Sequence, residues 1–170
     1  MRADDEHTCL SRREFLLLGG KLVLLAAASA AAEPVWAQRA EFVPLSLGRL
    51  SALETGVPRY FDYPQAGDLN MLIRLGVAAG GGIGPLADVV AFSTTCTHLG
   101  GKLRGALQAG LQVLGPCPRH LTTFDLSRHG VVITGHATAS LPQVVLQLEG
   151  DDIRAVGMQG LVYRDRGRDV

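Results

Sequence analysis

Two short segments, each with one cysteine and one histidine, constrain this chain more than any other feature. The first contains Cys96 and His98 with one residue between them, and the second contains Cys117 and His120 with two between them. Two Cys and two His on short loops can bind a tetrahedral zinc ion. They can also hold a two-iron cluster, with both thiolates on one iron and both imidazoles on the other. Either metal centre requires the chain to bring the two segments together.

The spacing and composition of these segments favour the two-iron cluster. Cys96 and His98 are closer in sequence than two ligands of a zinc knuckle usually are. Each segment also mixes one Cys with one His, whereas zinc fingers usually pair like with like. A zinc site that serves as an interaction module, or unrelated Cys and His side chains in the core, are the alternatives to this interpretation.

The residues around the four candidate ligands resemble the two-box signature of the Rieske family. Cys-Thr-His-Leu-Gly occupies 96–100, and Cys-Pro-Arg-His at 117–120 precedes Thr-Thr-Phe-Asp. The resemblance implies an all-β fold, an antiparallel β-sandwich or barrel with a small cluster-binding subdomain at about 96–125. It also implies a Rieske [2Fe-2S] cluster with four ligands, Cys96, His98, Cys117 and His120.

Departures from the family pattern concern how the two loops are held together. Many Rieske proteins have a second Cys in each box, and those two residues form a disulfide. Gly101 and Arg119 stand at these positions here, and the third Cys of the chain, Cys9, lies in a predicted export segment. We therefore expect no intramolecular disulfide, and we expect packing and backbone hydrogen bonds to hold the loops.

Five neighbours of the ligands are expected to cover or tune the cluster, whose potential depends on charge, hydrogen bonds to sulfur and exposure. High-potential relatives carry Ser and Tyr hydroxyls where this chain has Thr122 and Phe124, so one of the two hydrogen bonds should be missing. Arg119 adds a cation that favours the reduced form, although a purely solvated side chain is the alternative. Leu99 and Leu121 are expected to form lids. His129 and His136 lie in turn contexts, which favours surface or structural roles.

Residues 1–37 have the features of an export signal. Ser11-Arg12-Arg13 precedes an apolar run, and small residues follow up to Ala37. The arginine pair is typical of the twin-arginine route, which exports folded proteins to the periplasm. An uncleaved membrane anchor is the alternative, and Lys21 with two glycines weakens it. The mature domain is therefore expected at 38–170.

The remainder of the chain has the pattern of a small antiparallel β structure, with short apolar runs between Gly and Pro turns. The run 79–85 is glycine-rich but lacks GxGxxG, so it is not expected to bind phosphate. A formal net charge of +0 argues against a nucleic-acid partner. The expected strands span 42–45, 60–63, 71–75, 89–93, 111–114, 131–134, 143–148, 153–156 and 161–163, with a hairpin between the two boxes.

Three stretches that extend well beyond the boxes, 82–98, 135–143 and 150–163, resemble the small subunit of arsenite oxidase. This resemblance implies an electron-transfer subunit that is not catalytic alone. Its partners would be a large subunit with a molybdopterin cofactor and a periplasmic cytochrome c or cupredoxin. The related iodate reductase small subunit is the closest alternative. The Rieske subunit of a cytochrome bc complex is a further one, which Phe124 disfavours.

Overall fold

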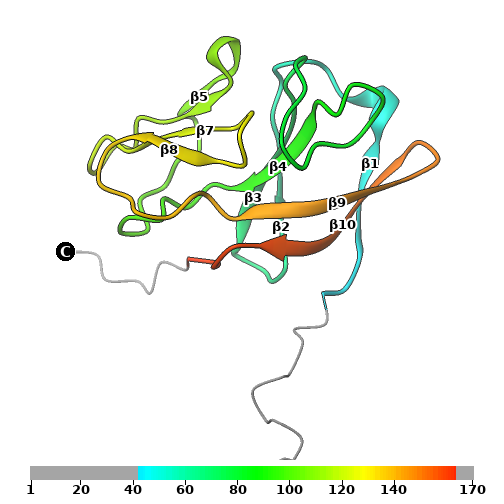
Figure 1. Cartoon of the computed structure of the whole chain (residues 1–170). Coiled ribbons are helices and arrows are strands. Elements are labelled where there is room, and N and C mark those ends of the chain that lie inside the picture. The colour runs from blue at the N-terminus through cyan, green and yellow to red at the C-terminus, as the bar shows by residue number, and fades with distance from the viewer. Residues whose placement is uncertain (1–41, 164–170) are drawn as a thin grey trace, which may run out of the picture. The chain divides into compact units, whose positions relative to one another are not determined.

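The computed structural model describes residues 42–163, which form two antiparallel sheets (Figure 1). The predicted export signal and the end of the chain beyond residue 163 lie outside these residues. The larger sheet has the strand order β1-β10-β9-β4-β3-β2. Its strands are β1 (Leu45–Arg49), β2 (Arg59–Asp62), β3 (Leu69–Arg74), β4 (Val89–Ser93), β9 (Gln143–Glu149) and β10 (Asp152–Gln159). Within residues 42–163, no helix has the length and apolar character that a membrane span requires.

The smaller sheet is built mainly from the residues between and after the two Cys/His segments. Its order is β5-β6-β7-β8. Its strands are β5 (Leu107–Gln108), β6 (Val113–Leu114), β7 (Thr123–Asp125) and β8 (Val131–Thr134). Two 3-10 turns complete the secondary structure, η1 (Leu50–Ala52) and η2 (Ala109–Leu111). The insertion of this sheet between β4 and β9 forms the small subdomain that the sequence predicted.

Strands β3 and β4 are buried on both faces, which explains their nearly continuous apolar sequences. Successive side chains of a strand point to opposite faces, so each strand contributes to two cores. Met71 and Phe92 belong to the core that also contains the two cysteines, whereas Leu72 and Ala91 belong to the other. The cysteine side chains are therefore part of the packed interior that joins the two sheets.

The all-β class and the hairpin between the boxes are confirmed, whereas three details of the strand prediction are wrong. The first strand begins at Leu45 rather than at Phe42, and β6 is shorter than the predicted 111–114 because Gln112 has a left-handed φ of 54°. Residues 161–163 form no strand. Strand β7 is not among the predicted strands, because Thr-Thr-Phe-Asp matches the metal-binding box and has no strand pattern of its own.

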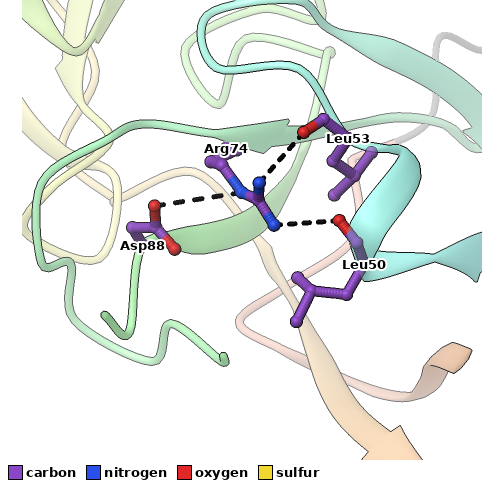
Figure 2. A network of polar contacts seen from close by, with 4 residues as sticks. All are labelled: Leu50, Leu53, Arg74 and Asp88. Atoms are coloured by element: carbon purple, nitrogen blue, oxygen red, sulfur yellow. Dashed lines mark hydrogen bonds and ion pairs between the residues drawn. The ribbon is translucent and has the colours of Figure 1, made fainter. Parts of the chain in front are cut away.

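A charged network ties η1 and the residue that follows it to the larger sheet (Figure 2). Arg74, the last residue of β3, donates hydrogen bonds to the carbonyl oxygens of Leu53, at 3.1 Å, and Leu50, at 2.9 Å. Its Nε lies 4.0 Å from the carboxylate of Asp88, whose side chain is only 6% exposed. The guanidinium thus satisfies two carbonyls and neutralises a buried carboxylate.

Candidate metal centre

The first ligand loop is closed by main-chain hydrogen bonds around Cys96. The backbone N–H of Cys96 donates to the carbonyl of Gly101 at 2.8 Å, and the N–H of Gly100 donates back to the carbonyl of Cys96 at 2.9 Å. Thr95 and Lys102, which flank this loop on its two sides, pair with each other in an antiparallel bridge. The loop therefore emerges just beyond the end of β4 with its cysteine at a fixed position.

The second ligand loop repeats this arrangement around Cys117. The N–H of Cys117 donates to the carbonyl of Thr122 at 2.8 Å, and the N–H of Leu121 donates to the carbonyl of Cys117 at 2.9 Å. The loop connects β6 and β7, which pair at Leu114 and Phe124. Leu121 takes the place of Gly100 and adopts a left-handed φ of 59°. Both cysteines thus sit in the same kind of main-chain frame, whose hydrogen bonds lie within each loop.

The structure brings the four predicted ligands together as two pairs. Cys96 and Cys117 are 1% and 2% exposed, are not in a disulfide and interact with each other. The imidazoles of His98 and His120 lie edge to face with 4.7 Å between their ring centroids. His120 is exposed and His98 is half-buried. The thiols therefore lie deep and the imidazoles lie toward the surface, as expected from the sequence.

Two observations show that these side chains suit a two-metal cluster. The Nδ1 atom of His98 is buried and has no hydrogen-bond partner, which is costly unless a metal binds there. The two thiols lie together and the two imidazoles lie together, which provides a two-sulfur site beside a two-nitrogen site.

The electrostatics of the site also reflect this separation of thiols from imidazoles. Burial raises the pKa of the Cys96 thiol, and the neighbouring Cys117 adds to the increase. The backbone N–H of His98 and the hydroxyl of Thr122 act in the opposite direction. Burial is the main cause that lowers the pKa of His98, and the nearby imidazoles of His120 and His136 lower it further. Neutral imidazoles are the form that binds metal, whereas the thiols must lose their protons as metal binds.

The predicted tuning residues all lie at this site. Leu99 and Leu121 are 60% and 67% exposed at the tips of the two loops. Thr122 is fully buried, with its hydroxyl close enough to interact with the Cys96 thiol. Phe124 is fully buried in the core cluster that contains both cysteines.

Gly101 and Arg119, which replace the disulfide pair, lie near each other on the two loops. Arg119 donates a hydrogen bond to the carbonyl of Leu99 at 3.2 Å. A Cβ atom at Gly101 would lie 3.5 Å from the Cγ and Cδ atoms of Arg119 and 2.6 Å from the Sγ of Cys117. The side chains of Cys117 and Arg119 in the second loop therefore fill the space that a side chain at residue 101 would need.

Two further residues, His136 and Thr97, lie at this site although the sequence does not mark them as part of it. The ring of His136 stacks on that of His98, with centroids 5.6 Å apart, and lies 6.4 Å from that of His120. Thr97 is buried between the first pair of ligands and bonds the carbonyl of Ala139 at 2.6 Å. Neither position has a spacing that marks a ligand, so only the folded structure shows their proximity. His129, in contrast, bonds Gln143 at 2.9 Å.

The chain is similar to two curated proteins over nearly its whole length. It is 56% identical over 159 residues to the iodate reductase subunit IdrB of Denitromonas iodatirespirans, covering 93% of this chain and 86% of that protein. It is 55% identical over 163 residues to the iodate reductase subunit IdrB of Pseudomonas sp. (strain SCT), covering 94% and 85%. No family model matches the sequence.

Solved structures share the fold at lower sequence identity. The soluble domain of the Rieske protein II (soxF) from Sulfolobus acidocaldarius superimposes with a TM-score of 0.65 at 23% identity, covering 74% of this chain and 82% of that one. The ferredoxin of carbazole 1,9a-dioxygenase from Nocardioides aromaticivorans gives a TM-score of 0.50 at 23% identity, covering 68% and 98%. The architecture predicted from the two boxes is therefore that of Rieske proteins.

Proposed function

Since the chain belongs to the family of the iodate reductase subunit IdrB and has the Rieske fold, we propose that Cys96, His98, Cys117 and His120 hold a [2Fe-2S] cluster. The chain is an electron-transfer subunit of an oxidoreductase. The observation that carries the ligand assignment is the pairing of two buried thiols with two outward imidazoles across two similar loops.

When bound, such a cluster supplies reversible one-electron transfer. The main-chain frames of the two loops hold Cys96 and Cys117 in place, and the surrounding core excludes water from their sulfur atoms. The imidazoles of His98 and His120 occupy the more exposed side. A partner can approach this side without displacing any part of the core.

The partner that best fits this subunit is a large one with a molybdopterin cofactor, as the resemblance to the arsenite oxidase small subunit implies. That subunit would perform the oxygen-atom chemistry on an oxyanion, while this chain exchanges electrons with a cytochrome c or a cupredoxin. The names of the two curated relatives support iodate as the oxyanion. Arsenite is the competing substrate and is a direct outcome of the test below.

The expected location of the complex is the periplasm. The twin arginine, Arg12 and Arg13, supports export of the folded subunit with its cluster already inserted. This placement also suits a soluble cytochrome or cupredoxin as the electron partner.

The test uses the purified complex, with His120→Ala in this subunit and His129→Gln as the control at a histidine outside the proposed ligand set. We expect His120→Ala to remove the Rieske absorption and EPR signals and to stop turnover with the natural electron partner. Substrate binding by the large subunit should persist, because the oxygen-atom chemistry is placed there. Full turnover without the cluster would overturn the electron-transfer role.

Metal and substrate assays distinguish the remaining alternatives. Two irons and two sulfides per chain are expected in the wild-type protein, whereas one zinc per chain would indicate an interaction module. Iodate reduction without arsenite oxidation is the expected activity of the complex. The reverse result would assign the chain to the arsenite branch.

A further inference from the structure

Charge is distributed unevenly between the two parts of the domain, although the formal net charge of the chain is +0. Residues 94–142, which lie between β4 and β9, include both ligand loops and the smaller sheet. They contain four basic residues, Lys102, Arg104, Arg119 and Arg128, and one acidic residue, Asp125. With histidine counted as neutral, this subdomain therefore has a formal charge of +3.

The larger sheet and its connections carry the opposite charge. Residues 42–93 and 143–163 contain seven carboxylates and four arginines, which gives a formal charge of −3. Three of the carboxylates lie at the β9–β10 turn, at Glu149, Asp151 and Asp152. This turn is a whole strand length, about 20 Å, from the end of β9 that pairs with β4 just before the first ligand loop. Figure 1 shows the turn on one side of the domain and the smaller sheet on the other.

Two of the basic side chains lie at the ligand loops and are exposed. Arg119 is part of the second ligand loop and donates a hydrogen bond to the carbonyl of Leu99 at 3.2 Å. Arg104 follows the first ligand loop, and its guanidinium lies 4.9 Å from the centre of the Tyr60 ring. Among residues 42–163, neither guanidinium is paired with a carboxylate. Both therefore present positive charge to water.

The one carboxylate of the subdomain does not offset these cations, because it is engaged elsewhere. One oxygen of Asp125 accepts hydrogen bonds from the backbone N–H of Ser127, at 2.8 Å, and from its hydroxyl, at 2.6 Å. The other oxygen lies 3.8 Å from the Nε of Arg128. The ligand loops, whose tips expose Leu99 and Leu121, therefore combine apolar side chains with uncompensated positive charge.

This combination suits a transient partner better than a permanent one. The core of a permanent interface is depleted in charged residues. Electron carriers instead meet their partners through small contacts, and opposite charges speed the encounter. Because the net charge of the chain is zero, any attraction must come from the local charge of the subdomain. The negative charge of the larger sheet would then repel the same carrier from the opposite side.

We propose that the subdomain docks a soluble electron carrier whose redox centre is surrounded by carboxylates. Arg104 and Arg119 attract this carrier to the side of the domain where the imidazoles of His98 and His120 lie. One electron then passes between the two redox centres, and no covalent bond forms or breaks. This inference rests on the proposed function, because it defines the surface chemistry of the electron partner.

The first experiment uses small redox probes of opposite charge on the full-length subunit with its cluster reduced. Ferricyanide is an anion, tris(phenanthroline)cobalt(III) is a cation, and each accepts one electron from the cluster. Stopped-flow rates are measured from about 0.01 M to about 0.1 M ionic strength, over which the Debye length falls from about 30 Å to about 10 Å. We expect the ferricyanide rate to fall several-fold and the cobalt rate to rise. Equal salt dependence of the two, or the reverse order, would overturn the inference.

A second readout does not depend on electron transfer. Hexacyanochromate(III) is a redox-inert paramagnetic anion that broadens the NMR signals of the amides it approaches. We expect stronger broadening at Gly105, beside Arg104, than at Gly150 in the β9–β10 turn, and the cation hexaamminechromium(III) should reverse this order. Both glycines are exposed, so access alone does not distinguish them. Equal broadening at the two positions would contradict the separation of charge.

Charge-reversal variants locate the effect. Arg119→Glu and Arg104→Glu should each lower the ferricyanide rate several-fold at low ionic strength. Arg49→Glu is the matched control, because Arg49 is exposed at the end of β1 and pairs in register with Asp152, near the β9–β10 turn. Iron analysis and circular dichroism verify the cluster and the fold of each variant. If Arg119→Glu loses its cluster, Arg104→Glu and the NMR comparison decide. Equal effects at all three positions would reject a local role for the subdomain.

Further outcomes separate this inference from the function on which it rests. If the wild-type subunit carries no iron–sulfur cluster, the proposed function fails. If it carries the cluster but neither probe pair responds to charge, the docking inference alone is wrong. In the complete complex, turnover with the natural carrier should slow several-fold as salt is added. If ferricyanide oxidises the cluster of the free subunit but not that of the complex, the large subunit covers this face, and a soluble carrier is the wrong occupant.

Discussion

A Cβ atom at Gly101 would lie 2.6 Å from the Sγ of Cys117. Real Cβ atoms essentially never approach a neighbour this closely, so a side chain here must displace the sulfur or the loop. Gly101 is buried and has no left-handed φ that would require glycine. The close packing of the two loops is therefore the reason for glycine at this position.

We expect Gly101→Ala to lower the iron content of the purified protein while the two sheets remain folded. The added methyl group displaces a proposed ligand, which iron analysis and visible absorption would detect. Gly110→Ala is the matched control, because a Cβ there meets nothing within 4 Å. Gly101→Cys with Arg119→Cys faces the same obstruction, so we expect it to give no disulfide. Normal iron content in Gly101→Ala would show that the loop yields readily.

Phe124→Tyr is expected to raise the midpoint potential of the cluster. Phe124 is fully buried beside the cysteines, and a hydroxyl that reaches a cluster ligand would favour the more negative, reduced form. One hydrogen bond of about 1 kcal/mol corresponds to about 40 mV for a one-electron couple. Phe61→Tyr, in the other core, is the control for a redox titration. An unchanged or lower potential in folded Phe124→Tyr would contradict the prediction.

Arg74→Met should destabilise the domain by about 2–3 kcal/mol, because it leaves the Asp88 carboxylate without its cation and two carbonyls without donors. The partial exposure of Arg74 keeps this estimate below that for a fully buried pair. Arg154→Met is the comparison, because Arg154 and Glu149 form a more exposed pair at 2.9 Å, whose loss should cost less than about 1 kcal/mol. Urea unfolding gives the free energy of unfolding of both variants. An equal loss of stability in the two would contradict the assigned role of Arg74.

Asp151 is expected to make the stability of the domain depend on pH in the acid range. Hydrogen bonds from the hydroxyl and the backbone N–H of Ser51 lower the pKa of this carboxyl below its ordinary value of 3.8. The contribution is therefore fully present above pH 3.8 and is lost as the pH falls through the lowered value. Unfolding titrations should show a shallower acid decline in Asp151→Asn. Identical acid slopes in the two proteins would reject this assignment.

Export should depend on the arginine pair at the start of the chain. We expect Arg12→Lys with Arg13→Lys to leave the subunit in the cytoplasm with its cluster inserted, because the twin-arginine route requires both residues. Cell fractionation with immunodetection measures the location, and the same change at Arg164 and Arg166 is a control for the loss of two guanidinium groups elsewhere in the chain. Normal periplasmic delivery of the double variant would contradict the predicted route.

The fold class, and the proximity of the two Cys/His segments, could be predicted because they depend on local sequence. The spacing within each box identified both Cys/His pairs, and alternating apolar residues located β9 near its observed bounds. Gln112, in contrast, shortens β6 through a left-handed conformation that its residue type does not signal. Phe124 and its neighbours form β7 because they pair with β6 and β8, which is a tertiary effect.

The contribution of His136 could not be predicted for a different reason. Its position depends on how the segment after β8 folds back over the two boxes, and a backbone amide bond to Thr122 leaves no mark in the sequence. Thr97 was visible only as part of a motif, although its hydroxyl bonds a residue far along the chain. Long-range hydrogen bonds made by ordinary residues are therefore the part of this site that required the structure.

The main-chain frame shared by the two ligand loops makes each loop a transferable unit. Each frame needs a short connection just beyond an antiparallel strand pair or bridge, and the hydrogen bonds that close it use no side-chain atoms. A protein designer could therefore graft both loops onto two neighbouring hairpins of an unrelated β scaffold and keep the cysteine positions. In such a graft, the exposed residues between the ligands of the second loop, Pro118 and Arg119, become positions for adjusting the electrochemistry without rebuilding the scaffold.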